Sequence, residues 1–249
     1  MLIDTHAHIN MLSNPEQGII EAREAGVKEI IIPSASSDDF ENILEICHKF
    51  DDVYATLGVH PEDCEKFSDN TAKKIMNLAQ HKKVVGIGEI GLDYHYTKEN
   101  KDIQKRVFKT QLEIAKILNL PVVIHDREAH EDTFEIIQEF NLKDVVFHCF
   151  SGNSEFAQKC IDKGYYIAIG GVVTFKNAKD LKEVAKIVPL EKLLLETDAP
   201  YLAPVPYRGK LNTPAYLKYI AQEIANIKEI DVKLVKEQTT QNAKRIFGI

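Results

Sequence analysis

The sequence lacks the marks of several large classes of protein. Its 4 cysteines form no C-x-x-C pair, so neither a cysteine zinc site nor a disulfide framework is expected. No stretch approaches the roughly 20 consecutive apolar residues of a membrane span, and nothing resembles a signal peptide. We therefore expect a cytosolic protein with reduced thiols that does not bind membranes.

Positive charge is also scarce. The chain has 31 Lys and Arg against 38 Asp and Glu, which gives a formal net charge of -7. This balance argues against a broad basic surface that would hold nucleic acid by charge alone. A nucleic-acid substrate would therefore have to be held by a few local cations.

The chain does contain a regular alternation of short β-branched runs with stretches of helical spacing. The clearest helix spans residues 103–118, between the fourth and fifth runs. No linker rich in Pro, Gly or Ser divides the chain. An open doubly wound sheet would favour a G-x-G-x-x-G motif after the first run, and the chain has none there. The pattern predicts one α/β domain over residues 1–249, a TIM (β/α)8 barrel. Its eight strands are expected to begin at Leu2, Val27, Val53, Val84, Pro121, Val145, Tyr165 and Leu193.

Ionisable residues stand where these runs end. Six of the runs end in DTHAH, LGVHPED, GIGEIGLD, VVIHDRE, VFHCFSG and LLLETDAPY. Chemistry in this fold sits on the loops at the carboxyl ends of the strands, so these residues are expected to converge on one rim. The expected set is His6, His8, His60, Glu89, His125, His148 and Asp198.

Imidazole and carboxylate groups without cysteine suit Zn²⁺, Mn²⁺ or Fe²⁺. Six such ligands, the whole set except His60, exceed what one catalytic ion normally takes from protein, so two ions sharing a carboxylate fit better. Glu89 is the natural bridge because it comes from the middle of the barrel order. The ligands then divide into His6, His8 and Asp198 for one ion, and His125 and His148 for the other.

The quoted motifs resemble those of the TatD family of metal-dependent deoxyribonucleases, a branch of the amidohydrolase-like barrels. The resemblance covers nearly the whole chain and rests on DTHAH, GEIGLDY, PVVIHDREA, HCFSG, LLLETDAPYLAP and RGKLNTP. It implies a binuclear site on the six ligands named above, and we expect two divalent cations there, Zn²⁺, Mn²⁺ or Mg²⁺. It also implies cleavage of nucleic-acid phosphodiesters, with 3′ to 5′ exonuclease action on single strands of DNA. The loop HYTKENKD after Tyr94 does not align with the family pattern, which leaves the substrate preference open.

Three residues are expected to take part in catalysis. A water between two cations loses a proton near neutral pH, and the hydroxide can attack phosphorus in line. Glu89 would fix the position of that water by bridging the ions, and Asp198 could orient it and accept its proton. His60 could contact the scissile phosphate or protonate the leaving group; alternatively, it caps the turn before Pro61.

Few cations lie near the expected rim. Arg127 follows the fifth run, and Arg208 and Lys210 lie in PYRGKLN. Guanidinium groups suit phosphates, so we expect all three residues to bind substrate. Alternatively, Arg127 pairs with a neighbouring glutamate and PYRGKLN forms an ordinary surface turn. Three tyrosines near these segments could stack bases: Tyr94, Tyr201 and Tyr207.

Two other functions remain open at this stage. A barrel of this type could hydrolyse an amide, ester or lactone, such as a D-aminoacyl-tRNA ester. Many such enzymes bridge their metals with a modified lysine on the fourth strand, whereas here Lys82 and Lys83 precede that strand and Glu89 holds the position. A non-catalytic metal-binding or nucleic-acid-binding protein is the third possibility, which the intact ligand set disfavours. We expect the protein to act as a monomer.

Overall fold

Eight parallel strands are hydrogen-bonded in chain order in the computed structural model, which describes residues 1–95 and 99–249. Short apolar runs form each strand, and nearly all of their residues are buried because helices cover one face and the barrel interior the other. The strands are β1 (Leu2–Asp4), β2 (Val27–Pro33), β3 (Val53–Leu57), β4 (Val84–Asp93), β5 (Val122–Arg127), β6 (Val145–Phe147), β7 (Tyr166–Ile169) and β8 (Leu193–Leu195).

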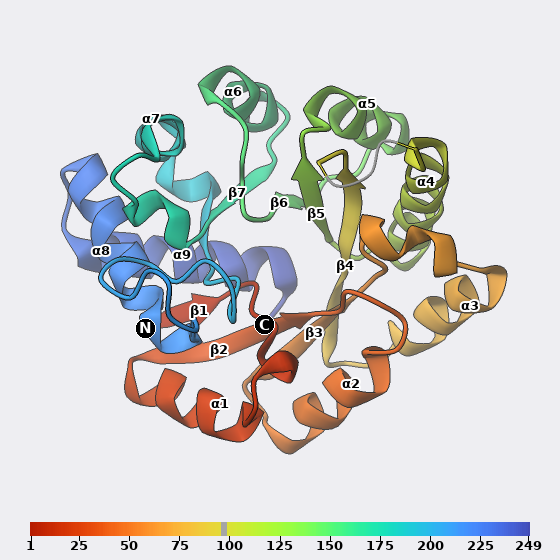
Figure 1. Ribbon diagram of the computed structural model, residues 1–249, viewed down its shortest axis with the longest axis horizontal. Helices are drawn as coiled ribbons and strands as arrows, with labels where there is room; N and C mark the ends of the chain where they lie inside the picture. Colours follow the sequence, from red (N-terminus) through yellow and green to blue (C-terminus); the bar gives the residue numbers. More distant parts are fainter. Residues whose placement is uncertain (96–98) are drawn as a thin grey trace.

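Helices surround these strands as a ring (Figure 1). The helices of the described residues are α1 (Pro15–Glu24), α2 (Phe40–Lys49), α3 (Asp69–Leu78), α4 (Lys101–Leu118), α5 (His130–Phe140), α6 (Ser154–Asp162), α7 (Lys179–Ile187), α8 (Leu217–Lys228) and α9 (Val232–Phe247). Short 3₁₀ helices lie in the connections: η1 (Ile9–Met11), η2 (Pro61–Lys66), η3 (Gly171–Thr174), η4 (Leu190–Lys192) and η5 (Pro214–Tyr216). None of the helices within the described ranges is long and apolar enough to cross a membrane.

Backbone hydrogen bonds beyond the strand ends bring β1 and β8 together. The Thr5 amide donates to the Leu195 carbonyl at 3.2 Å, and the Asp198 amide donates to the His6 carbonyl at 2.9 Å. These bonds join the first and last strands of the sheet. The segments that follow β1 and β8 therefore lie side by side at the carboxyl ends of the strands.

The core has two parts. A large cluster packs the outer faces of the strands against the helices. A smaller one takes side chains from seven strands and from α9, including Ile3, Val85, Val123 and Phe247, and fills the barrel interior. Helix α9 packs against β1, β8 and η4, the segment leading into β8, so it covers the amino ends of the strands. The carboxyl ends are left to the polar residues.

The predicted barrel is confirmed. Six of the eight strands begin at the predicted residue, and the other two begin one residue later, at Val122 and Tyr166. The predicted helix between the fourth and fifth strands is α4, which ends at Leu118 as expected and begins two residues before the predicted start, at Lys101. The strand ends carry their ionisable residues to one side of the barrel.

Candidate metal centre

The histidine pair after β1 lies beside Asp198. The side chains of His6 and His8 are both buried. The amide of His8 donates to the Ala199 carbonyl at 2.7 Å, and Asp198 takes a left-handed backbone conformation with φ of 56°. The buried Asp4 carboxylate is hydrogen-bonded to Thr197, the residue before Asp198. Its Oδ1 and Oδ2 accept hydrogen bonds from the amide and hydroxyl of Thr197, at 3.0 and 2.6 Å.

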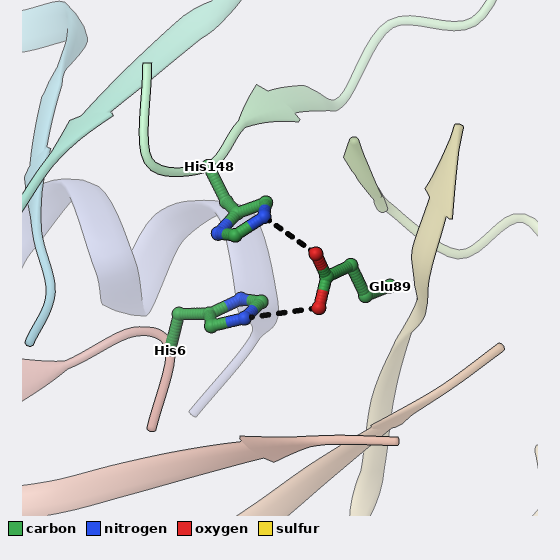
Figure 2. Close-up of side chains that lie close together, drawn as sticks. All are labelled: His6, Glu89 and His148. Carbon is green, nitrogen blue, oxygen red and sulfur yellow. Dashed lines mark ion pairs between the residues drawn. The ribbon is translucent and has the colours of Figure 1, made fainter. Parts of the chain in front are cut away.

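Glu89, on β4, stands between two groups of histidines, and Figure 2 shows its carboxylate reaching between His6 and His148. Its Oε2 lies 3.4 Å from the Nε2 of His6 and 3.6 Å from the Nε2 of His8. Its Oε1 lies 2.7 Å from the Nε2 of His148 and 2.7 Å from the Nδ1 of His125. The two oxygens of one carboxylate thus face different ligand groups.

The group around Oε2 has the spacing of a cation site. Asp198 Oδ1 lies 3.9 Å from the Nε2 of His6 and 3.7 Å from the Nε2 of His8. Ligand atoms about 2.0–2.2 Å from a common tetrahedral ion stand roughly 3.3–3.6 Å apart. Glu89 Oε2 lies within this range of both imidazole nitrogens and Asp198 Oδ1 lies slightly beyond it, so the four atoms are arranged around a gap that one cation could fill.

Unpartnered ring nitrogens point to the same conclusion. Both ring nitrogens of His6 and the Nδ1 of His8 are buried without a hydrogen-bond partner among the described residues. A buried polar atom without a partner destabilises a fold by about 1–3 kcal/mol, unless a ligand satisfies it. The Nε2 of His6 faces the gap between Glu89 and Asp198, where a divalent cation would satisfy it.

The second group lies around Oε1. His125 and His148 come from the neighbouring strand ends of β5 and β6, and the Nδ1 of His125 lies 3.4 Å from the Nε2 of His148. His60 also belongs here, with its Nε2 3.5 Å from Glu89 Oε1. The described part of the chain contains three groups of residues that could each hold a metal ion. One is His60, Glu89 and His125; the second is His6, Glu89 and His148; the third is His6, His8 and Asp198.

Burial and the neighbouring charged groups together shift the pKa values of these residues. Burial raises the pKa of Asp198 to about 8, and burial also lowers the pKa of His6 well below its usual range. Burial opposes ionisation of Glu89 too, but the facing imidazoles of His148 and His60 bring its pKa well below the usual range. A cation would favour a charged Asp198 and a neutral His6, so the donor set fits a divalent metal.

Two supporting carboxylates were missed by sequence reasoning. Asp93 accepts a hydrogen bond from the Nε2 of His125 at 2.9 Å. Glu196 lies 3.6 Å from the Nδ1 of His148 and accepts a hydrogen bond from the amide of Cys149. A histidine that binds a metal through one ring nitrogen commonly donates a hydrogen bond from the other nitrogen to a carboxylate. The available signal was an acidic residue at the end of the same strand runs, GIGEIGLD and LLLETDAPY.

A pocket of about 1010 Å³ opens over the cluster. The described residues that line it include the ligands His8, Glu89, His125, His148 and Asp198. Its walls continue to the start of α7, at residues 177–181, and to the segment after β8, at Tyr201 and Leu202. The candidate ligands therefore lie at the base of a cavity large enough for a substrate.

The predicted substrate-binding cations lie in different places. Arg127, at the end of β5, lines the pocket. Arg208 is outside the pocket lining and packs its guanidinium over the ring of Phe175, at 4.4 Å from the centroid. Lys210 lies on the same loop, with its Nζ 5.8 Å from the ring centroid of Tyr207. Of the three cations, the structure brings one beside the candidate ligands.

His60 has two contacts. Its Nδ1 accepts a hydrogen bond from the amide of Glu62 at 3.2 Å, so the predicted capping of the turn at Pro61 is confirmed. Its Nε2 points toward Glu89, and the side chain lines the pocket. The cap therefore leaves the other nitrogen directed into the site.

Of the three tyrosines predicted to stack bases, one is placed to do so. Tyr201 lines the pocket and is 53% exposed. Tyr94 is buried, and its hydroxyl donates to Asp132 at 2.7 Å. Tyr207 is stacked on Tyr216, with ring centroids 4.1 Å apart. The expectation is wrong for Tyr94, because its ring is buried. Tyr207 is half-buried and lies outside the pocket lining, so base stacking by its ring stays a prediction.

Comparisons with known proteins agree with this geometry. The model of the family described as TatD related DNase matches residues 3–248. The uncharacterized metal-dependent hydrolase YabD of Bacillus subtilis is 43% identical, over 100% of both chains. The uncharacterized metal-dependent hydrolase YcfH of Escherichia coli (strain K12) is 37% identical, over 100% of this chain and 96% of its own. The crystal structure of YJJV, a TatD homologue from Escherichia coli, has a TM-score of 0.94 at 29% identity, over 100% of this chain and 98% of that one.

Proposed function

Because the chain belongs to the family of TatD related DNases, we propose that it is a metal-dependent hydrolase that cleaves phosphodiester bonds of nucleic acid. We further propose single-stranded DNA as its substrate, with 3′ to 5′ exonuclease action. One observation carries the proposal. Glu89 divides its two carboxylate oxygens between two histidine groups at the base of the pocket. The relatives named metal-dependent hydrolases support the hydrolase part.

Two divalent cations, Zn²⁺, Mn²⁺ or Mg²⁺, would be held by the six candidate ligands. When bound, they would lower the pKa of water and neutralise charge on phosphate oxygens. The chain's part is to fix the ligands and the substrate. Asp93 holds the ring of His125 in orientation through a hydrogen bond, Glu196 lies 3.6 Å from the Nδ1 of His148, and Glu89 lies where the two ligand groups meet.

Residues facing the pocket would position the phosphodiester. Because the Nδ1 of His60 accepts from the Glu62 amide, a neutral His60 carries its proton on Nε2. That nitrogen can donate a hydrogen bond to a phosphate oxygen, which favours the phosphate-contact role over leaving-group protonation. Asp198 reaches the pocket and can accept the proton of an attacking water.

Of the three predicted cations, Arg127 is the best placed for the scissile phosphate because it lines the same pocket as the ligands. Arg208 and Lys210 stay predicted contacts of nucleotides farther along the strand. Cytosolic location and a monomeric state also stay predictions from the sequence.

The competing ester or amide hydrolase has less support. The ammonium group of Lys83 donates to the carbonyls of Phe50 and Asp51, at 3.1 and 2.7 Å, before β4 begins. It is therefore held at the opposite end of that strand from Glu89. A lysine bridge of the amidohydrolase type has no candidate on the described part of β4.

The decisive experiment offers both substrates to the same protein. Metal-stripped protein is refilled separately with Mg²⁺, Mn²⁺ or Zn²⁺, then given a 5′-labelled single strand of DNA and a D-aminoacyl ester. Stepwise shortening of the labelled strand from its 3′ end supports the proposal. Ester cleavage without nucleotide release would replace it with the second function, and no cleavage with any metal would leave a binding protein.

A further inference from the structure

Three exposed apolar side chains lie beside the candidate metal centre. Met11, at the end of η1, and Tyr201 and Leu202, after β8, line the pocket and are 43, 53 and 41% exposed. The Tyr201 hydroxyl lies 3.5 Å from the Met11 sulfur. The ring centroid of Tyr201 lies 6.2 Å from that of His8. These three residues, the apolar ledge, thus adjoin a candidate ligand directly.

The backbone of the ledge is held in an unfavourable conformation. Leu202 has φ of 53°, in the left-handed region that residues with a Cβ rarely adopt. Its carbonyl also sits so close to Gly171 that a Cβ there would meet the oxygen at 2.1 Å. Strain combined with an apolar side chain left in water is typical of a ligand-binding position rather than of packing.

Hydrogen bonds fix the ledge relative to the ligands. The Tyr201 amide donates to the Asp198 carbonyl at 2.9 Å. The side-chain amide of the buried Asn212 donates to the carbonyls of Thr197 and Tyr201, at 2.7 and 2.6 Å. The segment that carries Asp198 therefore carries the ledge as well. Because this segment is already ordered, a ligand that stacks there would cost it little conformational entropy.

We propose that the apolar ledge binds the nucleobase adjacent to the scissile phosphate. This rests on the proposed function and assigns the base its place in the same pocket. The phosphate would lie between the ligand cluster and Arg127, and the base would stack on Tyr201 and Leu202. Because Tyr201 and Leu202 present ring and methyl surface, the ledge should bind any of the four bases with similar affinity.

The test separates base from backbone. A short 5′-fluorescein-labelled single strand of DNA is compared with one whose 3′-terminal nucleotides are abasic. Binding to metal-stripped protein is followed by fluorescence anisotropy, which needs no cleavage. Wild-type protein should bind the base-bearing strand more tightly. Tyr201→Ala should weaken that binding roughly 10-fold and leave the abasic strand unchanged.

Matched variants control for folding and for general surface effects. Tyr201→Phe keeps the ring and should bind both strands as wild type does. Leu211→Ala removes a 66% exposed side chain of the same loop, outside the pocket lining, and should change neither strand. The proposal is wrong if wild-type protein binds the two strands equally or binds neither. It is also wrong if Tyr201→Ala weakens the affinity for both strands equally.

A parallel cleavage assay with Mn²⁺ keeps the two proposals apart. If wild type releases no nucleotide from either strand, the proposed nuclease function is wrong, whatever the anisotropy shows. If wild type cleaves both strands and Tyr201→Ala slows both alike, the nuclease stands and the ledge is wrong. Selective slowing on the base-bearing strand supports both.

Discussion

Asp93 accepts a hydrogen bond from the Nε2 of His125 at 2.9 Å and so turns the Nδ1 of that ring toward Glu89. Asp93 is itself buried, and its backbone amide is held by the side chain of Gln104. The orientation of His125 therefore depends on a carboxylate that does not belong to the candidate ligand set.

Asp93→Asn should lower metal affinity by about 10- to 100-fold, because the amide can hold the ring but no longer makes it more basic. Competition with a chromophoric chelator measures the change. Glu41→Gln, which alters a surface pair with Lys74, is the control and should leave affinity unchanged. Wild-type affinity in Asp93→Asn would mean that His125 needs no such partner.

Glu89→Gln and His8→Ala should differ in metal stoichiometry. Glu89 faces both ligand groups, so the uncharged side chain of Glu89→Gln should weaken retention of both ions and leave nuclease activity near background. His8 faces one group, so its loss should release one ion and spare the other. Elemental analysis of the dialysed proteins counts the ions. A Glu89→Gln protein that keeps two ions and most of its activity would point to a single-metal site.

Gln111→Leu should destabilise the fold and loosen the His60 segment. The buried Gln111 accepts from the Val59 amide at 2.7 Å and donates to the Val59 carbonyl at 3.0 Å. Leucine would leave both groups unpaired, and the free energy of unfolding should fall by about 2–3 kcal/mol. Urea denaturation measures the change. Gln222→Leu, on the exposed face of α8, should lie within about 0.5 kcal/mol of wild type.

Arg127→Ala should weaken binding of single-stranded DNA more than Arg208→Ala does. Arg127 lines the pocket, whereas Arg208 packs on Phe175 outside its lining. We expect roughly 10-fold weaker binding for Arg127→Ala, with metal content unchanged, and a smaller loss for Arg208→Ala. The slope of log affinity against log salt should become shallower by about 0.7 for each phosphate that the variant no longer neutralises. An unchanged slope in Arg127→Ala would show that this side chain touches no phosphate.

The sequence by itself determined the architecture and the set of candidate ligands. Strand and helix periods are local properties of the chain, and eight alternations leave one common way to bury the apolar runs. Because parallel strands in a barrel end on the same side, a polar residue at each strand end was enough to predict convergence. Glu89, His125 and Asp198 could therefore be assigned to one site without knowledge of any contact.

The tertiary structure alone decided which side chains surround those ligands. Asp93 accepts a hydrogen bond from His125, which lies on the next strand. Tyr207 stacks on Tyr216, which lies farther along the same loop. Arg208 lies outside the pocket lining because its loop packs on Phe175. Such pairings depend on the exact placement of loops, which no periodic pattern encodes. The positions of the strand ends follow from local spacing, whereas the partners of each side chain follow from how the barrel closes.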